Sequence, residues 1–178
     1  IFAQIREMLR PGDVFIDAGA NIGVYTVLAS RHVGASGRVI CVEMMPDTVD
    51  QLERNVRLNG LSNVTIIRKA LSDTGNQTLT ATVEPGRFGR ASISVVHEES
   101  AKIPVLTTTL DDITLGIDSV RLMKMDIEGA EYLALQGAKS LMQRLDSVIY
   151  EKWGADTAAE DAVGDCLIAN SFKLFTKS

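Results

Sequence analysis

The stretch DVFIDAGANIG, residues 13–23, decides the fold of this chain. Its first half, DVFIDA, is a short and mostly apolar run of the kind that forms a buried strand. Its second half is a glycine turn, and a helical pattern follows it as far as about Val33. A buried strand that passes through such a turn into a helix is typical of a parallel sheet, whose ligands bind beyond the carboxyl ends of the strands.

Outward from this stretch, short β-rich runs alternate with helical patterns along most of the chain. The further strands are predicted at RVICVE (38–43), NVTIIR (63–68), VRLMKMD (120–126), DSVIYE (146–151) and FKLFT (172–176). Helices are predicted before Pro11, from Pro46 to a stop at Gly60, from about Gly129 to Arg144, and near 157–170. Because parallel strands need covering crossovers, this alternation predicts an α/β fold with a doubly wound, mostly parallel, Rossmann-like sheet.

Residues 74–109 break this rhythm. LTATV and IPVLTTTL are strand-like, and the glycine- and arginine-rich piece EPGRFGRAS lies between them. We therefore expect an inserted β hairpin or flap around 74–109 rather than a helix. Its Arg87, Arg90, Ser92 and His97 are candidates for contact with an acceptor, although a solvated loop is the simpler explanation for them.

Composition bounds the class of protein. The chain has 178 residues, 46% of them hydrophobic and 23% charged, which suits one domain with a single core. Its formal net charge of −5 and the lack of a basic cluster disfavour a nucleic-acid partner, and no apolar stretch is long enough for a membrane span. The two cysteines are far apart, which favours a reducing, cytoplasmic location and argues against structural zinc.

The ends of the chain suggest missing flanks. It starts at Ile1 rather than at Met and stops directly after the last predicted strand. We expect residues 1–178 to form a single domain that is truncated at one or both ends.

The glycine turn favours one kind of cofactor. Gly19-Ala20-Asn21-Ile22-Gly23 is one residue shorter than the G-x-G-x-x-G fingerprint of NAD sites, and Asp17 would repel a pyrophosphate. A carboxylate there suits a cationic amino group, and Glu43 stands where a carboxylate accepts both hydroxyls of a ribose. A ligand with a ribose and an ammonium but no phosphate is S-adenosylmethionine (SAM). Taken singly, these residues are equally explained by a tight turn and by solvated strand ends.

With these motifs the sequence resembles the FkbM family of SAM-dependent methyltransferases over most of residues 11–151. The matching pieces, in the family's order, are VFIDAGANIGVYT (14–26), GRVICVEMMPDTVDQLERNVRLNGLSNV (37–64), KALSD (69–73), LTTTLDD (106–112) and LMKMDIEGAEYLALQGA (122–138). One departure is Met44-Met45, where a proline-containing turn is expected after Glu43.

The resemblance implies a seven-stranded class I methyltransferase fold that moves a methyl group from SAM to a hydroxyl, often on a sugar or a polyketide-type acceptor. It also implies the cofactor-binding residues. The turn residues would border the methionine part, Glu43 with Met44 the ribose, Ala70 the adenine, and Asp126 the methyl group. The implied set is Asp17, Gly19, Ala20, Asn21, Gly23, Glu43, Met44, Ala70 and Asp126.

The motif DIEGAE (126–131) carries the candidate chemistry. An alcohol is a weak nucleophile at neutral pH, and we expect Asp126 to act as its general base or to orient it, with Glu128 beside it. Glu128 and Glu131 also suit the start of a helix, where acidic side chains are favourable. The three carboxylates could bind a divalent cation, but the sequence places no histidine or Asp-Asn pair that would complete the site, and no metal is expected. Lys124 would lie on the same strand face as Asp126, and a buried lysine there needs a partner such as Asp17 or Glu151.

Three functions remain open at this stage. The leading one is a SAM-dependent O-methyltransferase that acts on a small-molecule or saccharide acceptor, with neither nucleic acid nor membrane as partner. The alternatives are a SAM-binding domain without chemistry of its own and an NAD(P)-dependent oxidoreductase. Trp153, just past a predicted strand, could stack on a sugar or pack in the core.

Overall fold

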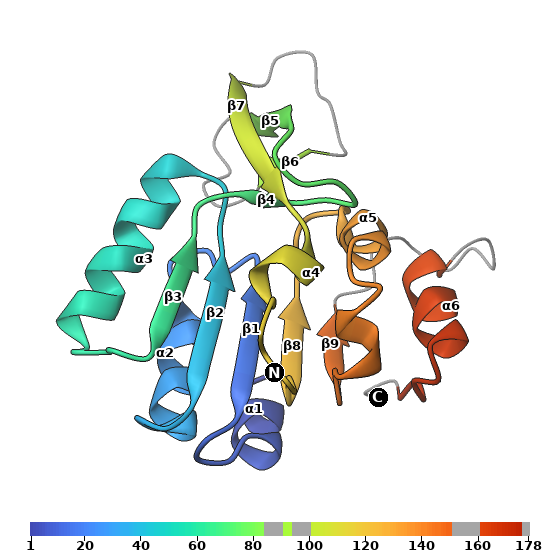
Figure 1. Cartoon of the computed structure of the whole chain (residues 1–178). Coiled ribbons are helices and arrows are strands. Elements are labelled where there is room, and N and C mark those ends of the chain that lie inside the picture. The colour runs from blue at the N-terminus through green and yellow to red at the C-terminus, as the bar shows by residue number, and fades with distance from the viewer. Residues whose placement is uncertain (84–90, 94–100, 151–160, 176–178) are drawn as a thin grey trace.

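A five-stranded parallel sheet forms the centre of the molecule. The computed structural model describes residues 1–83, 91–93, 101–150 and 161–175. The strand order is β3-β2-β1-β8-β9, and every neighbouring pair is parallel (Figure 1). The strands are β1 Val14–Ala18, β2 Arg38–Val42, β3 Val64–Ile67, β8 Leu122–Met125 and β9 Val148–Tyr150. The order reverses between β1 and β8, which is the point where sheets of this kind bind ligands.

Alternating side chains give this sheet two buried faces. Phe15, Val39 and Leu122 point to one face, where they pack against α1 (Phe2–Met8) and α2 (Val24–Val33). On the same face Cys41 packs against Leu52 of α3 (Pro46–Leu58). Helix α3 begins at its proline and is followed by Gly60 in the left-handed region, as the sequence predicts.

The opposite face has its own helices. Ile16 and Met123 belong to one apolar cluster with Leu110, Ala134 and Leu167. These last three residues come from α4 (Leu110–Ile113), α5 (Glu131–Gln136) and α6 (Ala162–Ala169), and the 3₁₀ turn η1 (Leu141–Gln143) joins them. Helices therefore cover both faces, and the predicted doubly wound α/β fold is confirmed.

A second, four-stranded sheet lies over the carboxyl ends of the parallel strands (Figure 1). Its order is β4-β7-β5-β6, with β4 at Ala70–Leu71, β5 at Thr78–Val83, β6 at Ala91–Ser92 and β7 at Ala101–Thr108. Strands β5 and β7 are antiparallel and confirm the hairpin expected around 74–109. Strand β4 pairs with β7 in parallel, which extends this sheet to the chain that leaves β3.

Two predicted elements differ in the structure. The helix expected up to Arg144 stops at Gln136 with Gly137 as its C-cap, and a Cβ on Gly137 would lie 2.4 Å from the carbonyl oxygen of Ser72, so only glycine fits there. The Asp111 carboxylate then accepts the amide protons of Ser140 and Leu141 at the start of η1. The strand expected at 172–176 is wrong over residues 172–175, because this segment pairs with no strand among the described residues.

Within the described residues, no helix has the length and apolar character needed to cross a membrane.

Candidate active site

One cavity of about 350 Å³ lies at the carboxyl ends of β1, β2 and β8, under the second sheet. Eight of the residues predicted to bind the cofactor or to act in catalysis line it. They are Gly19, Ala20, Asn21, Glu43, Met44, Ala70, Asp126 and Glu128. The other two predicted residues, Asp17 and Gly23, lie beside the cavity and do not line it.

The glycine turn after β1 is compressed against the end of β8. Gly19 has a φ of +72°, and a Cβ there would lie 1.9 Å from the carbonyl oxygen of Asp126. The group that approaches Gly19 is therefore the Asp126 peptide. Gly23 begins α2 with a φ of +89°, and a Cβ there would meet Leu52 of α3 at 2.5 Å.

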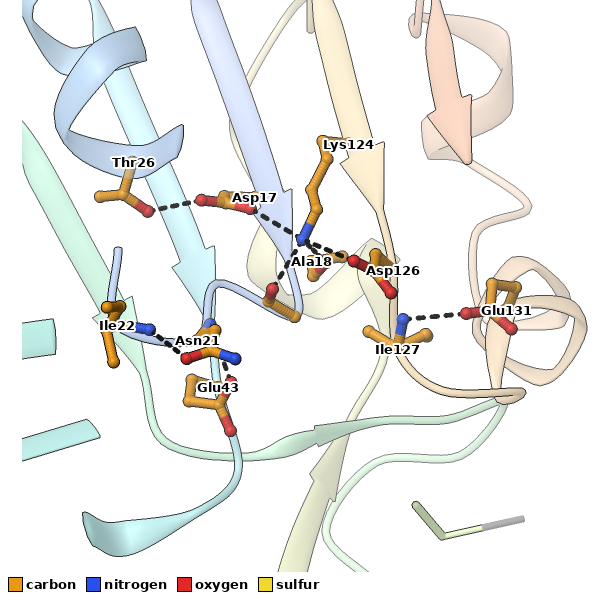
Figure 2. Close-up of polar contacts among 11 residues, drawn as sticks. Asp17, Ala18, Asn21, Ile22, Thr26, Glu43, Lys124, Asp126, Ile127 and Glu131 are labelled. Carbon is orange, nitrogen blue, oxygen red and sulfur yellow. Dashed lines mark hydrogen bonds and ion pairs between the residues drawn. The ribbon is translucent and has the colours of Figure 1, made fainter. Parts of the chain in front are cut away.

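Glu43 follows β2 and faces the same turn. One carboxylate oxygen accepts the amide protons of Met44 and Met45, at 2.9 and 3.0 Å. The other accepts the amide proton of Asn21 at 3.0 Å (Figure 2). Burial raises the pKa of Glu43 above its ordinary value, and these three hydrogen bonds oppose the rise. A carboxylate oxygen can accept two hydrogen bonds. The oxygen that accepts only the Asn21 amide proton can therefore accept one more, from a ligand in the cavity.

Asp17 and Lys124 form a buried pair beneath the cavity. They are register partners on β1 and β8, and their side chains are 0% and 3% exposed. The Lys124 ammonium lies 3.5 Å from Oδ1 of Asp17, which confirms the expectation that a carboxylate partners this lysine. The Thr26 hydroxyl donates to the other Asp17 oxygen at 2.7 Å (Figure 2). Burial raises the pKa of Asp17, and its interactions with Lys124 and Thr26 oppose the rise.

Asp126 directly follows β8 and lines the cavity. Its Oδ2 lies 3.8 Å from the Lys124 ammonium, and its side chain is 35% exposed. Glu128 lines the same cavity with a φ of +55°, an unusual conformation for a residue other than glycine. Glu131 has a different task, because it accepts the Ile127 amide proton at 2.8 Å and so secures the start of α5 (Figure 2).

The second sheet closes the cavity from above. Ala91 and Ile93, which flank Ser92 of β6, line the cavity. The Ser92 hydroxyl donates to the carbonyl oxygen of Glu128 at 2.8 Å, which ties this sheet to the turn after Asp126. Sequence reasoning missed Ala91, Ile93 and also Tyr25, whose ring lies 5.6 Å from the Lys124 ammonium. Tyr25 is only two residues past the glycine turn, which is the one signal that could have identified it.

Several predicted contacts cannot be placed. Arg87, Arg90, His97, Glu151 and Trp153 lie outside the described residues. In the part of the chain that the structure does describe, no three His, Cys, Asp or Glu side chains are grouped in a way that could hold a metal ion.

The cavity suits the parts of SAM. Carboxylate and carbonyl oxygens suit its ammonium and its ribose hydroxyls, while Met44, Ala70 and Leu71 give an apolar surface for a flat ring. A glycine turn after the first strand, a carboxylate after the second and a carboxylate after β8 together define a class I SAM-dependent methyltransferase. The chain belongs to the Methyltransferase FkbM domain family, whose model matches residues 17–162.

Relatives and solved structures agree with this assignment. Methyltransferase sdnD of Sordaria araneosa is 27% identical over 177 residues, covering 80% of this chain and 68% of that protein. A SAM-dependent methyltransferase from Aquifex aeolicus has a TM-score of 0.55 at 17% identity, covering 98% of this chain and 80% of the other. An rRNA methylase from Streptococcus thermophilus has a TM-score of 0.54 at 11% identity, covering 98% and 77%. At these identities the two structures show the shared fold alone.

Proposed function

We propose that residues 1–178 form one domain that methylates a hydroxyl group of a small-molecule or saccharide acceptor. The observation that carries this proposal is the position of Asp126, whose partly exposed carboxylate lines the same cavity as Glu43. A ribose-binding carboxylate and a base that line one cavity are what transfer from SAM to an alcohol requires.

The cofactor-binding role falls to residues that follow β1 and β2, together with Ala70 and Asp126. Glu43 would accept the ribose hydroxyls with the acceptor capacity that its amide contacts leave, and Met44 and Ala70 would border the ribose and adenine. Gly19, Ala20, Asn21 and Asp126 would border the methionine part, with Gly23 and Asp17 supporting them from outside the cavity. Bound SAM would supply an electrophilic methyl group on a positively charged sulfur.

Asp126 would act on the acceptor. An alcohol oxygen attacks well only as its proton leaves, and the Asp126 carboxylate can accept that proton. The neighbouring Lys124 ammonium lies 3.8 Å from Oδ2 of Asp126. Glu128 faces the same cavity and would accept a hydrogen bond from a further acceptor hydroxyl.

Charge supports a neutral acceptor over nucleic acid. Three carboxylates, those of Glu43, Asp126 and Glu128, line the cavity against two lysines, and one of these, Lys124, is buried. The whole chain carries a formal net charge of −5. A polyanion is repelled by such a surface, whereas a sugar or another polyol can hydrogen-bond to carboxylates.

Titration calorimetry with SAM and S-adenosylhomocysteine (SAH) tests the cofactor residues. We expect wild type to bind at a Kd of about 1 μM, which corresponds to about −8 kcal/mol, and Glu43→Ala to bind at least ~10-fold more weakly. Glu7→Ala is the matched control, because Glu7 is an exposed carboxylate on α1, outside the cavity. Equal affinity of wild type and Glu43→Ala would contradict the proposed ribose contact.

Asp126→Ala separates an enzyme from a binding domain. In a screen of hydroxylated acceptors, this variant should lose about 10²–10⁴-fold in turnover, while its affinity for SAH should fall far less than its turnover. Undiminished turnover would remove Asp126 from the chemistry. Binding of NAD(P) in place of SAH would revive the oxidoreductase alternative.

A further inference from the structure

The hydrogen bonds of Lys124 do not match those of a simple counter-ion. A lysine whose task is to neutralise a buried carboxylate forms a charge-assisted hydrogen bond to it at about 2.7–2.9 Å. Here the ammonium lies 3.5 Å from Asp17, and that Asp17 oxygen accepts no hydrogen bond among the described residues. The shortest contact of the ammonium is instead with the backbone carbonyl oxygen of Gly19, at 2.7 Å.

Two backbone carbonyls at the end of β1 therefore take the lysine's hydrogen bonds. Besides the Gly19 carbonyl, the ammonium donates to the carbonyl of Ala18 at 3.3 Å (Figure 2). Asp17 and Asp126 lie at 3.5 and 3.8 Å, one on each side of it. The Tyr25 ring, 5.6 Å away, completes its surroundings on the α2 side. Among the described residues, the Gly19 carbonyl accepts a hydrogen bond from Lys124 alone.

The Gly19 carbonyl belongs to the peptide unit that begins the cofactor turn. The amide of the same unit, on Ala20, donates to the carbonyl of Val42 in β2 at 3.0 Å. This peptide is thus held from β8 on one side and from β2 on the other. The next amide, that of Asn21, donates to Glu43, so the orientation of the peptide affects the proposed ribose carboxylate as well.

We propose that Lys124 is the positioning residue of the cofactor site, holding the Gly19–Ala20 peptide so that the glycine turn and Glu43 are fixed before the cofactor binds. Asp17 anchors the ammonium from below, and Asp126 meets it at the cavity wall. The inference rests on the proposed cofactor-binding role of this cavity. Removal of the ammonium frees the Gly19–Ala20 peptide on its β8 side. Cofactor binding must then also order the glycine turn, which weakens the affinity.

SAH binding measured by calorimetry tests this on a small set of variants. Lys124→Met keeps the apolar stem of the side chain and should raise the Kd for SAH by about 10-fold. The exposed Lys139→Met is the matched control and should bind SAH as wild type does. Lys124→Met also leaves Asp17 without its cation, so loss of stability alone does not distinguish positioning from neutralisation.

The double variant Asp17→Asn/Lys124→Met makes that distinction, because it removes both buried charges. If Lys124 positions the turn, the double variant regains thermal stability over Lys124→Met yet keeps the weakened SAH binding. If Lys124 only neutralises Asp17, SAH binding returns to the wild-type value together with stability, and the proposal is overturned. Where Lys124→Met does not fold, the double variant is compared with Asp17→Asn, and equal affinity of these two variants for SAH overturns the proposal.

Hydrogen exchange on the wild-type protein gives an independent measurement. The Ala20 amide should exchange as slowly as the amides of β2, and exchange at the rate of an exposed loop would overturn the proposal. The proposed function fails separately, through a wild type that binds no SAH or a Glu43→Ala variant that binds it fully. If wild type binds SAH and Glu43→Ala binds it weakly, while Lys124→Met and the double variant bind it like wild type, only the role of Lys124 is disproved.

Discussion

Gly19 and Asp126 approach each other so closely that a side chain on the first would collide with the main chain of the second. A Cβ atom added to Gly19 would lie 1.9 Å from the Asp126 carbonyl oxygen. This contact brings the turn after β1 and the end of β8 together at the floor of one cavity. It also means that the contact with the Asp126 main chain is by itself sufficient to require glycine at position 19.

Gly19→Ala should therefore destabilise the fold far more than its backbone conformation alone explains. Gly116 has nearly the same φ, +75° against +72°, but open space where its Cβ would lie, so Gly116→Ala reports the strain alone. We expect about 1–2 kcal/mol for Gly116→Ala and about 3–5 kcal/mol for Gly19→Ala, measured by urea unfolding. Equal losses would show that the two strand ends separate easily.

Thr26→Val should destabilise the protein by about 1–3 kcal/mol, because it leaves one oxygen of the buried Asp17 without its hydroxyl donor. Thr26→Ser keeps the donor and loses only a methyl group, so it should retain most of the stability. Thermal melting followed by circular dichroism is sufficient, since 1 kcal/mol shifts the Tm of a domain of this size by about 2–4 °C. A serine variant as unstable as the valine variant would contradict the role given to the hydroxyl.

Asp17 should make stability depend on pH in a defined direction. Burial raises its pKa in the folded state above the ordinary value of 3.8, so the folded state binds the proton more tightly than the unfolded state. The stability this contributes is fully present below that value and is lost as the pH rises through the folded-state pKa. Asp17→Asn cannot titrate, so the free energy of unfolding of wild type relative to this variant should fall as the pH rises above the ordinary value of 3.8.

Urea unfolding of both proteins across that range measures the difference. A difference that grows in favour of wild type as the pH rises would mean that the Lys124 ammonium outweighs burial and lowers the pKa of Asp17.

Ser92→Ala should loosen the second sheet over the cavity, because the Ser92 hydroxyl ties β6 to the Glu128 carbonyl. Loss of one such hydrogen bond should speed amide exchange in β6 by about 2–10-fold, while exchange in β1 and β2 stays unchanged. Thr80→Ala, at an exposed position on β5 of the same sheet, is the control. Unchanged exchange in β6 would show that its pairing with β5 is enough to hold it.

The sequence predicts most of the parallel sheet because each strand is a short apolar run between turn signals. The start of α3 at Pro46 and its stop before Gly60 follow from local backbone preferences, which act without the rest of the fold. The end of α5 at Gln136 was not foreseen, and its C-cap Gly137 lies against the carbonyl of Ser72, a residue 65 positions earlier in the chain. Strand β4 also has no local signal, because Ala70–Leu71 becomes a strand only by pairing with β7.

The candidate site divides in the same way. Strand ends fix where Glu43 and Asp126 lie, and sequence alone brings both to one edge of the sheet. The contacts between Asn21 and Glu43 and between Lys124 and Gly19 involve backbone atoms, whose orientation depends on the turn conformation. The types of side chain in the sequence do not indicate the orientation of these backbone atoms. Sequence reasoning therefore expected a carboxylate partner for Lys124 and did not foresee its carbonyl partners.

The second sheet is one uninterrupted stretch of chain, from Ala70 to Thr108, inserted between β3 and β8. Its first and last strands, β4 and β7, pair with each other in parallel, so the stretch leaves and rejoins the core at neighbouring points. An exchange of the whole stretch for that of a related protein would leave Gly19, Glu43, Lys124 and Asp126 in their own sequence context. The roof of the cavity is in this sense a replaceable cassette, and chimeras built at its two ends would vary the roof while the floor stays constant.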